Sequence, residues 1–367
     1  MSKLYQERMQ QLHTYMEKEE LDAVLITSPK HVYYLTGFFT EPHERFMGLI
    51  IPAQGEPSLI VPALDREAAA AAASGVKQIL THTDTDNPYD VLKQALPAGV
   101  TRLGIEKSHM TVERFEAMSA VVSAKRYADV EEPLREMRLI KSAEEVARIR
   151  HAVRLVEQAL SESLKKVKPG VTEMEIVAEL EYQMKRLGAD GPSFDTMVLA
   201  GEKSALPHGT PGSRQVREGD LLLFDLGVAA DGYVSDITRT FAIGEISAQL
   251  REIYETVLAA NEAAIAEVRP GVTLAHLDQT ARRVIEEKGY GPYFMHRLGH
   301  GLGMDVHEYP SVHGQNQDVL RPGMVFTIEP GIYLPGVGGV RIEDDVLVTD
   351  SGCDVLTQFP KQLTVIR

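Results

Sequence analysis

A duplicated segment constrains this chain more than any other feature of its sequence. Residues 167–194 read VKPGVTEMEIVAELEYQMKRLGADGPSF, and residues 268–294 read VRPGVTLAHLDQTARRVIEEKGYGPYF. Each copy has PGVT, an amphipathic helical pattern and a Gly-Pro pair in the same order. Further on, REGDLLLFDLG from Arg217 aligns with RPGMVFTIEPG from Arg321. The repeat predicts two helix-plus-hairpin halves that face each other about a pseudo-two-fold axis.

The residues before the first copy predict a separate α/β domain. Short branched apolar stretches are typical of strands, and longer amphipathic or alanine-rich stretches are typical of helices. The predicted strands are 21–27, 46–52 and 57–63, and the predicted helices are 65–74 and 88–96. Ser142 followed by Glu145 has the spacing of a capping box, so another helix is expected to begin near 142. We predict an N-terminal α/β domain at 1–130, a linker at 131–141 and a catalytic domain at 142–367.

Charge and cysteine content narrow the possible partners and compartment. The net charge of -15 over 367 residues argues against nucleic acid or an anionic membrane surface as a partner. No apolar run approaches the eighteen or so residues that a membrane span requires. The single Cys353 cannot form an intramolecular disulfide, and charges are spread through the first 26 residues, where a signal peptide would need a continuous apolar region. We therefore expect a cytoplasmic protein that binds neither nucleic acid nor membranes.

Two acidic residues oppose each other in the first predicted hairpin. The stretch DLLLFDLGVAADGYVSDITRTFAIG, residues 220–244, has its predicted turn at 229–232. Pairing of Val228 with Tyr233 would place Asp225 opposite Asp236. Two carboxylates directly opposed between apolar strands repel each other and are costly to desolvate, so a cation is expected between them.

The second predicted hairpin repeats this arrangement. In MVFTIEPGIYLPGVGGVRIEDDVLV, residues 324–348, a turn near Gly336 would place Glu329 opposite Glu343. For one such hairpin, an equally good interpretation is a surface hairpin whose acids face water. Two copies of the pattern inside apolar strands favour a shared cation site.

A glycine-rich segment supplies candidate imidazole groups. Residues 294–308, FMHRLGHGLGMDVHE, contain three histidines and three alternating glycines. His296 and His300 have the spacing of a metal-binding helix, but each glycine would cost about 1 kcal/mol in a helix interior. The segment is therefore predicted to be extended backbone that approaches another segment closely. His300 becomes the candidate metal ligand, while His296 and His307 either contact substrate or simply pack and form hydrogen bonds near the site.

Four carboxylates and one imidazole form a suitable donor set for two divalent metal ions. Carboxylate oxygens suit manganese, and an added histidine also suits zinc, cobalt or iron, so these donors leave the metal open. The candidate ligands are Asp225, Asp236, His300, Glu329 and Glu343.

These five residues, in this order, resemble the ligands of the dinuclear metallopeptidases of family M24. The motifs RLGHGLGMDVHE, FTIEPGIY and GVRIEDDVLV resemble those of its proline-specific branch, which includes prolidase and aminopeptidase P. The resemblance extends over the whole chain, because an α/β domain before the catalytic domain is a feature of that branch. It implies an N-terminal α/β domain followed by an α+β catalytic domain of the pita-bread fold with internal pseudo-two-fold duplication.

The resemblance also implies a mechanism and roles for particular residues. Two divalent ions, with manganese preferred and cobalt or zinc as alternatives, would share a hydroxide that attacks the carbonyl carbon before proline. Glu329 would act as both ligand and proton shuttle, and His307 would stabilise the developing oxyanion or orient the carbonyl. His208, in ALPHGTPG, matches the substrate-side histidine of the family, and His296 is a further catalytic candidate. Arg341 would steady the carboxylate ligands, or form only a charge-balancing salt bridge.

Substrate length decides between the two proline peptidases. A dipeptide presents a free carboxylate one residue after the scissile bond, so a dipeptidase needs a cation there. Arg297 is the candidate for that cation, because it stands three residues before the candidate ligand His300. It would have to supply the charge alone, since Ser311 stands where some prolidases have an arginine. We expect a prolidase that cleaves Xaa-Pro dipeptides, with aminopeptidase P acting on longer peptides as the alternative. A peptide-binding module without catalysis is a more remote alternative.

One N-terminal loop resembles a segment that covers the substrate in small prolidases of lactic acid bacteria. Residues 36–48, TGFFTEPHERFMG, include His43 and Arg45, which become substrate-binding candidates on that basis. The alternative is a solvated charged turn. In proline-specific relatives the N-terminal domain of one subunit borders the active site of the other, so a homodimer is expected.

Overall fold

The computed structural model describes residues 3–367, which its internal contacts divide into two compact units. The first unit ends at Arg138, and the second extends over Leu139–Arg367. Among residues 3–367, none of the helices has the length and apolar character that crossing a membrane requires.

The first unit contains one six-stranded mixed sheet with the order β4-β3-β2-β1-β5-β6. β1 pairs antiparallel with β2 and parallel with β5. Side chains of these strands, such as Leu25, Ile50 and Leu103, form part of the core of this unit. All three predicted strands and both predicted helices of this region are confirmed. The elements are α1 (Lys3–Glu19), β1 (Ala23–Ile26), α2 (Pro29–Thr36), β2 (Gly48–Pro52), β3 (Ser58–Pro62), α3 (Arg66–Ala72), β4 (Gln78–His82), α4 (Pro88–Ala95), β5 (Arg102–Ile105), α5 (Val112–Val121), β6 (Arg126–Asp129) and α6 (Glu131–Leu139).

The segment expected as a linker, 131–141, is largely helical. Helix α6 occupies most of it and carries acidic residues in its first turn and Arg138 in its last, as the helix dipole favours. The next helix, α7 (Ala143–Leu164), begins where the sequence predicted a capping box. The Ser142 side chain accepts from the Glu145 backbone N–H, and the Glu145 carboxylate accepts from the Ser142 N–H.

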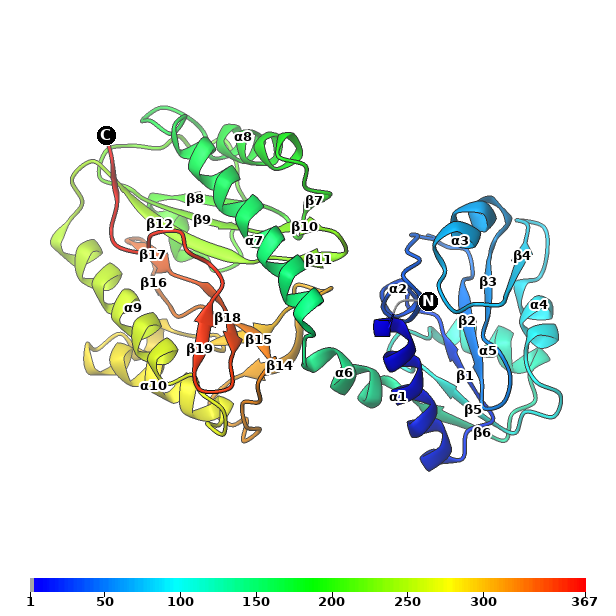
Figure 1. Cartoon of the computed structure of the whole chain (residues 1–367). Helices are drawn as coiled ribbons and strands as arrows, with labels where there is room; N and C mark the ends of the chain where they lie inside the picture. The colour runs from blue at the N-terminus through cyan, green and yellow to red at the C-terminus, as the bar shows by residue number, and fades with distance from the viewer. Residues whose placement is uncertain (1–2) are drawn as a thin grey trace. The chain divides into compact units, whose positions relative to one another are not determined.

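The second unit consists of two halves of similar construction. In the first half, α7 and α8 cover a sheet with the order β20-β12-β9-β8 (Figure 1). The elements of this half are α8 (Glu173–Arg186), β7 (Gly191–Pro192), β8 (Met197–Ala200), β9 (Leu221–Leu226), β10 (Val228–Ala230), β11 (Tyr233–Val234) and β12 (Ile237–Ile243), with β20 (Val365–Ile366) added from the C-terminal end.

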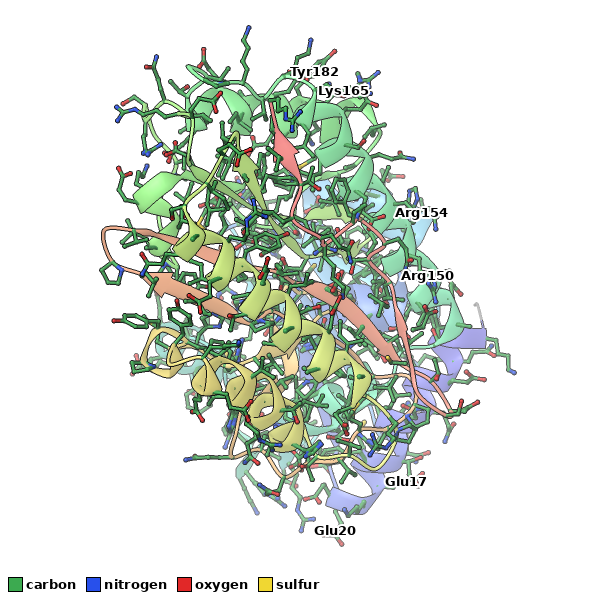
Figure 2. All side chains as sticks on the ribbon, turned by 90° about the vertical axis from the view of Figure 1, so that its left-hand side faces the viewer. Glu17, Glu20, Arg150, Arg154, Lys165 and Tyr182 are labelled. Carbon is green, nitrogen blue, oxygen red and sulfur yellow. The ribbon has the colours of Figure 1, made fainter. Side chains whose placement is uncertain are left out.

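In the second half, α9 and α10 cover a sheet with the order β14-β13-β15-β18-β19. Figure 2 shows the two helices lying side by side, with strands of this half behind them. The elements are α9 (Ala248–Ala266), α10 (Leu274–Glu287), β13 (Gly299–Gly301), β14 (Glu308–Val312), β15 (Val325–Ile328), β16 (Gly331–Leu334), β17 (Gly338–Arg341), β18 (Asp344–Val348) and β19 (Cys353–Val355).

Equivalent hydrogen bonds confirm the duplication that the sequence predicted. Thr172 forms an isolated antiparallel bridge with Gln215, and Thr273 forms the same bridge with Val319. Both threonines cap the helix that follows them. The strand order β12-β9-β8 in one half corresponds to β18-β15-β13 in the other. The two halves therefore share one plan, with a helix pair over strands that carry acidic residues.

The first hairpin differs from its predicted register. Ala230 pairs with Tyr233, and Asp225 lies opposite Thr238, so the prediction that Asp225 opposes Asp236 is wrong by two residues. The cause is a two-residue turn at Asp231-Gly232, where both residues have positive φ, in place of the four-residue turn that we predicted. Side chains alternate with a period of two, so Asp236 still faces the same side of the ladder as Asp225.

The second hairpin follows its predicted register. Gly331 pairs with Arg341 and Leu334 with Gly338, so the turn centres on Gly336, which has a φ of 73°. The same register continues beyond an interruption, where β15 pairs with β18. At this interruption, Glu329 and Glu343 lie opposite each other on the two arms of the hairpin, as predicted.

Candidate metal centre

Three of the predicted ligands come together as a buried cluster. Asp236, His300 and Glu343 each offer one ligand atom, and these atoms all lie within 4.8 Å of one another. Asp236 lies between β11 and β12, His300 in the middle of β13, and Glu343 between β17 and β18. The cluster thus draws on both halves of the duplicated unit.

The other two predicted ligands adjoin this cluster. Glu329, directly after β15, has its Oε1 3.3 Å from His300 Nε2, and Asp236 Oδ2 is 3.7 Å from the same nitrogen. Asp225, near the end of β9, pairs through Oδ2 with the guanidinium of Arg341. The structure therefore brings all five predicted ligands to one site.

The acids strongly perturb one another in this site. Burial, and then the charges of Glu343 and Asp225, raise the pKa of Asp236 well above its ordinary value. Burial and the charges of Glu329 and Asp225 likewise raise the pKa of Glu343. Burial opposes ionisation of Glu329 as well, but the hydrogen bond and charge of His300 lower its pKa to about 2. Carboxylates this close cannot all ionise unless positive charge is added.

The donor set fits a divalent metal ion. Among residues 3–367, no side chain or backbone group forms a hydrogen bond with the buried Oδ1 of Asp236 or Oε1 of Glu343. Buried polar atoms normally have partners, and carboxylate oxygens next to an imidazole nitrogen are suitable ligands for divalent metals.

The glycines on β13 explain how His300 reaches the acids. A Cβ on Gly299 would lie 1.9 Å from the Thr327 carbonyl oxygen, and one on Gly301 would lie 2.2 Å from that of Tyr309. The prediction is confirmed for 299–301, which is extended and packed closely against neighbouring backbone, whereas 303–307 form bends. The Nδ1 of His300 lies 3.2 Å from the Gly301 carbonyl oxygen, which leaves Nε2 directed at the carboxylates.

Arg341 is held beside the acids by several partners. Its Nε donates to Thr238 Oγ1 at 3.1 Å and its NH1 to the Tyr333 hydroxyl at 2.8 Å, while NH2 contacts Asp225. The Nε2 of His296 lies 2.9 Å from the same Tyr333 hydroxyl oxygen. Burial lowers the pKa of His296, which favours a neutral ring. Tyr333 thus connects two predicted site residues.

The two remaining candidate histidines lie on loops beside the cluster. The His307 ring packs against that of His300, with centroids 4.1 Å apart. Partial burial and then the nearby charge of His300 lower the pKa of His307, and His208 adds a smaller effect in the same direction. His208 lies on an exposed loop after β8.

Arg297 and the two N-terminal candidates have different surroundings. Arg297 donates from NH1 to Ser311 Oγ at 3.1 Å, and Ser311 lies opposite His300 across the β13–β14 pair. In the first unit, Arg45 donates to Asp84 at 2.7 Å and pairs with Glu44, and the exposed His43 has a φ of 55°. His43 and Arg45 line a cavity of about 240 Å³ within that unit.

Several contributing residues were missed by the sequence analysis. Thr238 donates to Glu343 Oε2 at 2.6 Å, and Thr327 Oγ1 accepts from the His300 N–H while lying 3.3 Å from Glu329 Oε1. Each threonine lies on a strand, two positions from a predicted ligand just beyond the end of that strand, so the two side chains face the same side. That spacing was a usable signal. Nothing in the sequence singled out Tyr333.

Comparisons with known proteins agree with this geometry. Residues 147–350 match the model of "Metallopeptidase family M24", which covers more than half of the chain. The chain belongs to metallopeptidase family M24. Residues 8–140 of this M24 chain match the "Creatinase/Prolidase N-terminal domain". The M24 chain is thus a metallopeptidase with the predicted fold, an α/β N-terminal domain followed by a pita-bread catalytic domain.

Individual relatives of this M24 metallopeptidase extend over nearly its whole length. It is 45% identical to the "Putative dipeptidase YkvY" of Bacillus subtilis (strain 168), over 98% of this chain and 99% of the relative. It is 39% identical to the prolidase of Pyrococcus horikoshii OT3, covering 97% and 99% of the two chains with a TM-score of 0.90. An X-Pro aminopeptidase of Thermotoga maritima MSB8 is 34% identical, covering 96% and 100%, with a TM-score of 0.88.

Proposed function

We propose that this metallopeptidase is a prolidase that hydrolyses the Xaa-Pro bond of dipeptides with two divalent metal ions. The observation that carries the proposal is the set of four carboxylates around His300, of which the buried Asp236 and Glu343 each have an oxygen atom without a partner. Asp225, Asp236, His300, Glu329 and Glu343 would hold the ions. Manganese is the preferred metal because most of the donors are carboxylates, and cobalt or zinc are alternatives.

Bound metal ions would supply Lewis acidity, which lowers the pKa of water toward neutrality and polarises a carbonyl oxygen. The residues of the chain would contribute the remaining steps. Glu329, adjacent to His300, takes the proton from the attacking water and passes it to the leaving proline nitrogen. His307, whose lowered pKa favours the neutral ring, orients the scissile carbonyl from the exposed side. Burial of the cluster excludes bulk water from the acids.

The residues around the metal ligands fix their orientation. Arg341 holds Asp225 and is itself held by Thr238 and Tyr333. His296 hydrogen-bonds with the same Tyr333 hydroxyl, which ties it to this network, and it would also contact substrate. Networks of this kind maintain the ligand geometry on which metal affinity depends.

Dipeptide specificity would come from Arg297. Its guanidinium is anchored on Ser311 by one hydrogen bond, which leaves other N–H groups for the free carboxylate of a dipeptide. The alternative function is that of aminopeptidase P on longer peptides, because one of the related solved structures is an X-Pro aminopeptidase. The substrates in both cases are small peptides with proline after the scissile bond.

A direct comparison of two substrates tests the function. The protein is loaded with manganese, cobalt or zinc, and the rates of Ala-Pro and Ala-Pro-Ala cleavage are measured. We expect faster cleavage of Ala-Pro, and no cleavage by Asp236→Asn, which removes a ligand charge without changing side-chain volume. Faster tripeptide cleavage would assign the chain to aminopeptidase P. Tight metal binding without cleavage of either peptide would indicate a peptide-binding module.

We further propose a homodimer in the cytoplasm. The single Cys353 suits a reducing compartment. The loop at 36–48 resembles a segment that covers the substrate in other prolidases, so His43 and Arg45 would contact substrate in the active site of the partner. Sedimentation velocity over a hundredfold range of concentration, about 0.1 to 10 μM, tests this assembly by mass action. A constant monomer mass would refute it.

A further inference from the structure

Glu173 is a fully buried carboxylate outside the acidic cluster. It is the first residue of α8, directly after the N-cap Thr172, and its relative exposure is 0%. Acidic side chains are almost never buried to this extent unless they are paired, because desolvating the charge costs several kcal/mol. The partners of Glu173 therefore indicate what this residue does.

Those partners lie at both ends of one loop. Glu173 Oε1 accepts from the Ala200 N–H at 2.9 Å, and Oε2 accepts from the Gly212 N–H at 2.9 Å. The ammonium group of Lys203 pairs with the same Oε2 and also donates to the Thr210 carbonyl oxygen at 3.0 Å. A single carboxylate thus binds both ends of the 200–212 segment and one lysine within it.

The loop that Glu173 closes carries His208. Its sequence after Ala200 is GEKSALPHGTPG, and His208 lies on its exposed side. Residues 201–205 of the loop pack against β17, the strand that ends in Arg341, so the loop lies beside the candidate metal centre. The Ser204 Oγ of this loop accepts from the Gly339 N–H at 2.8 Å, which fixes the loop to β17.

The second half of the duplicated unit supplies an internal comparison. Its α10 begins with Leu274, which follows Thr273 as Glu173 follows Thr172, and which is likewise fully buried. The backbone N–H groups of the two residues form equivalent bonds, to the Arg214 and Asp318 carbonyl oxygens respectively. The start of this helix therefore does not require an acid, and the carboxylate in the first half serves the loop instead.

We propose that Glu173 is a positioning residue, which closes the 200–212 loop and thereby holds His208 at the substrate side of the metal centre. Restraining a loop at both ends removes backbone freedom in the free protein that the loop would otherwise lose when substrate binds. The catalytic consequence rests on the proposed peptidase function. The effect on loop mobility does not depend on it.

The variant Glu173→Gln tests this role. An amide of the same size has one oxygen, and its NH2 group would face either a backbone N–H or the Lys203 ammonium. We expect kcat/KM for Ala-Pro to fall at least about tenfold, equivalent to about 1.4 kcal/mol. Amide hydrogen exchange at 201–212, measured without substrate, is expected to accelerate. Thr172→Ala is the matched control, because it removes the cap of the same helix and leaves the contacts to the loop intact.

A double-mutant cycle separates positioning from general destabilisation. In a His208→Ala background, Glu173→Gln should cost less than about twofold in kcat/KM, because the side chain that the loop positions is already absent. Equal losses in both backgrounds would overturn the proposal. An unchanged hydrogen-exchange rate at 201–212 would also overturn the proposal, whatever the activity. If the unmodified protein has no peptidase activity but exchange is faster in the variant, only the peptidase function would be rejected.

A second variant covers the case in which Glu173→Gln does not fold. Glu173→Leu combined with Lys203→Met places the residue of the second half at position 173 and leaves no unpaired buried charge. Replacing a buried ion pair with apolar groups is often neutral for stability. We expect a folded protein with a mobile 201–212 loop and the same loss of kcat/KM. Full activity in this folded variant would overturn the proposal.

Discussion

At the scale of single residues, the site depends on hydroxyl groups as much as on its charges. Thr238 contacts Glu343 and Arg341, Thr327 contacts His300, and Tyr333 joins Arg341 to His296. Each hydroxyl both donates and accepts, so it can connect an acid or base to the next group. The charged residues could be predicted from the sequence because they recur in both halves. These hydroxyl residues could not, because their role depends on which strands lie next to each other.

Arg297 is the residue on which substrate specificity should depend. Removing its side chain in Arg297→Ala deletes the cation that is expected to meet the carboxylate of a dipeptide. The Michaelis constant for Ala-Pro should rise at least about tenfold, or about 1.4 kcal/mol in binding, with a smaller change for Ala-Pro-Ala. Steady-state kinetics on both peptides measure the difference. Equal losses on the two would show that Arg297 does not bind the carboxylate.

At the scale of elements, the two hairpins show how far the sequence could predict register. The second hairpin was placed correctly because its turn centres on Gly336, the glycine of the Pro-Gly pair between its two strands. In the first, the Asp231-Gly232 pair is a strong signal for a two-residue turn, and a longer turn was assumed instead. An error of two residues keeps every side chain on its predicted face, so Asp225 and Asp236 reach one site despite the incorrect register.

The loop after β8 provides a test of pH dependence away from the acidic cluster. The hydrogen bond from Arg214 lowers the pKa of Glu202 from 4.5 to about 2. Because the pKa of Glu202 is lower in the folded state than in the unfolded state, its ionised carboxylate stabilises the protein at pH values above 4.5. This contribution is lost as the pH falls toward 2. The side chain of Glu202 is 59% exposed, so we expect a small effect.

Glu202→Gln removes this contribution. Its urea midpoint should therefore lie below that of the unmodified protein near pH 7, and the difference should shrink between about pH 5 and pH 3. Parallel urea titrations of the two proteins at about pH 5 and pH 3 measure the difference in midpoint. A difference that grows in acid would contradict the assigned direction of the pKa shift.

At the scale of the whole molecule, the catalytic unit should depend on metal for part of its stability. Without cations, the buried acids repel one another and hold protons, since burial and mutual charge raise the pKa values of Asp236 and Glu343. Metal at one hundred times its dissociation constant would add about 2.7 kcal/mol to the free energy of unfolding. Chelation should therefore lower the melting temperature, and restoring manganese should reverse the change. An unchanged melting curve in protein shown to be free of metal would count against the site.

The duplication has a consequence for how such a site could have arisen. Each half supplies two of the four acids, and only the second half supplies the imidazole of His300. A shorter ancestral polypeptide that corresponded to one half would have had two acids and an uncovered strand face. It could have assembled the full set of four only by associating with a second copy of itself. Fusing two such copies into one gene would have freed one half to diverge, so that one came to carry the histidine and the other the loop with His208.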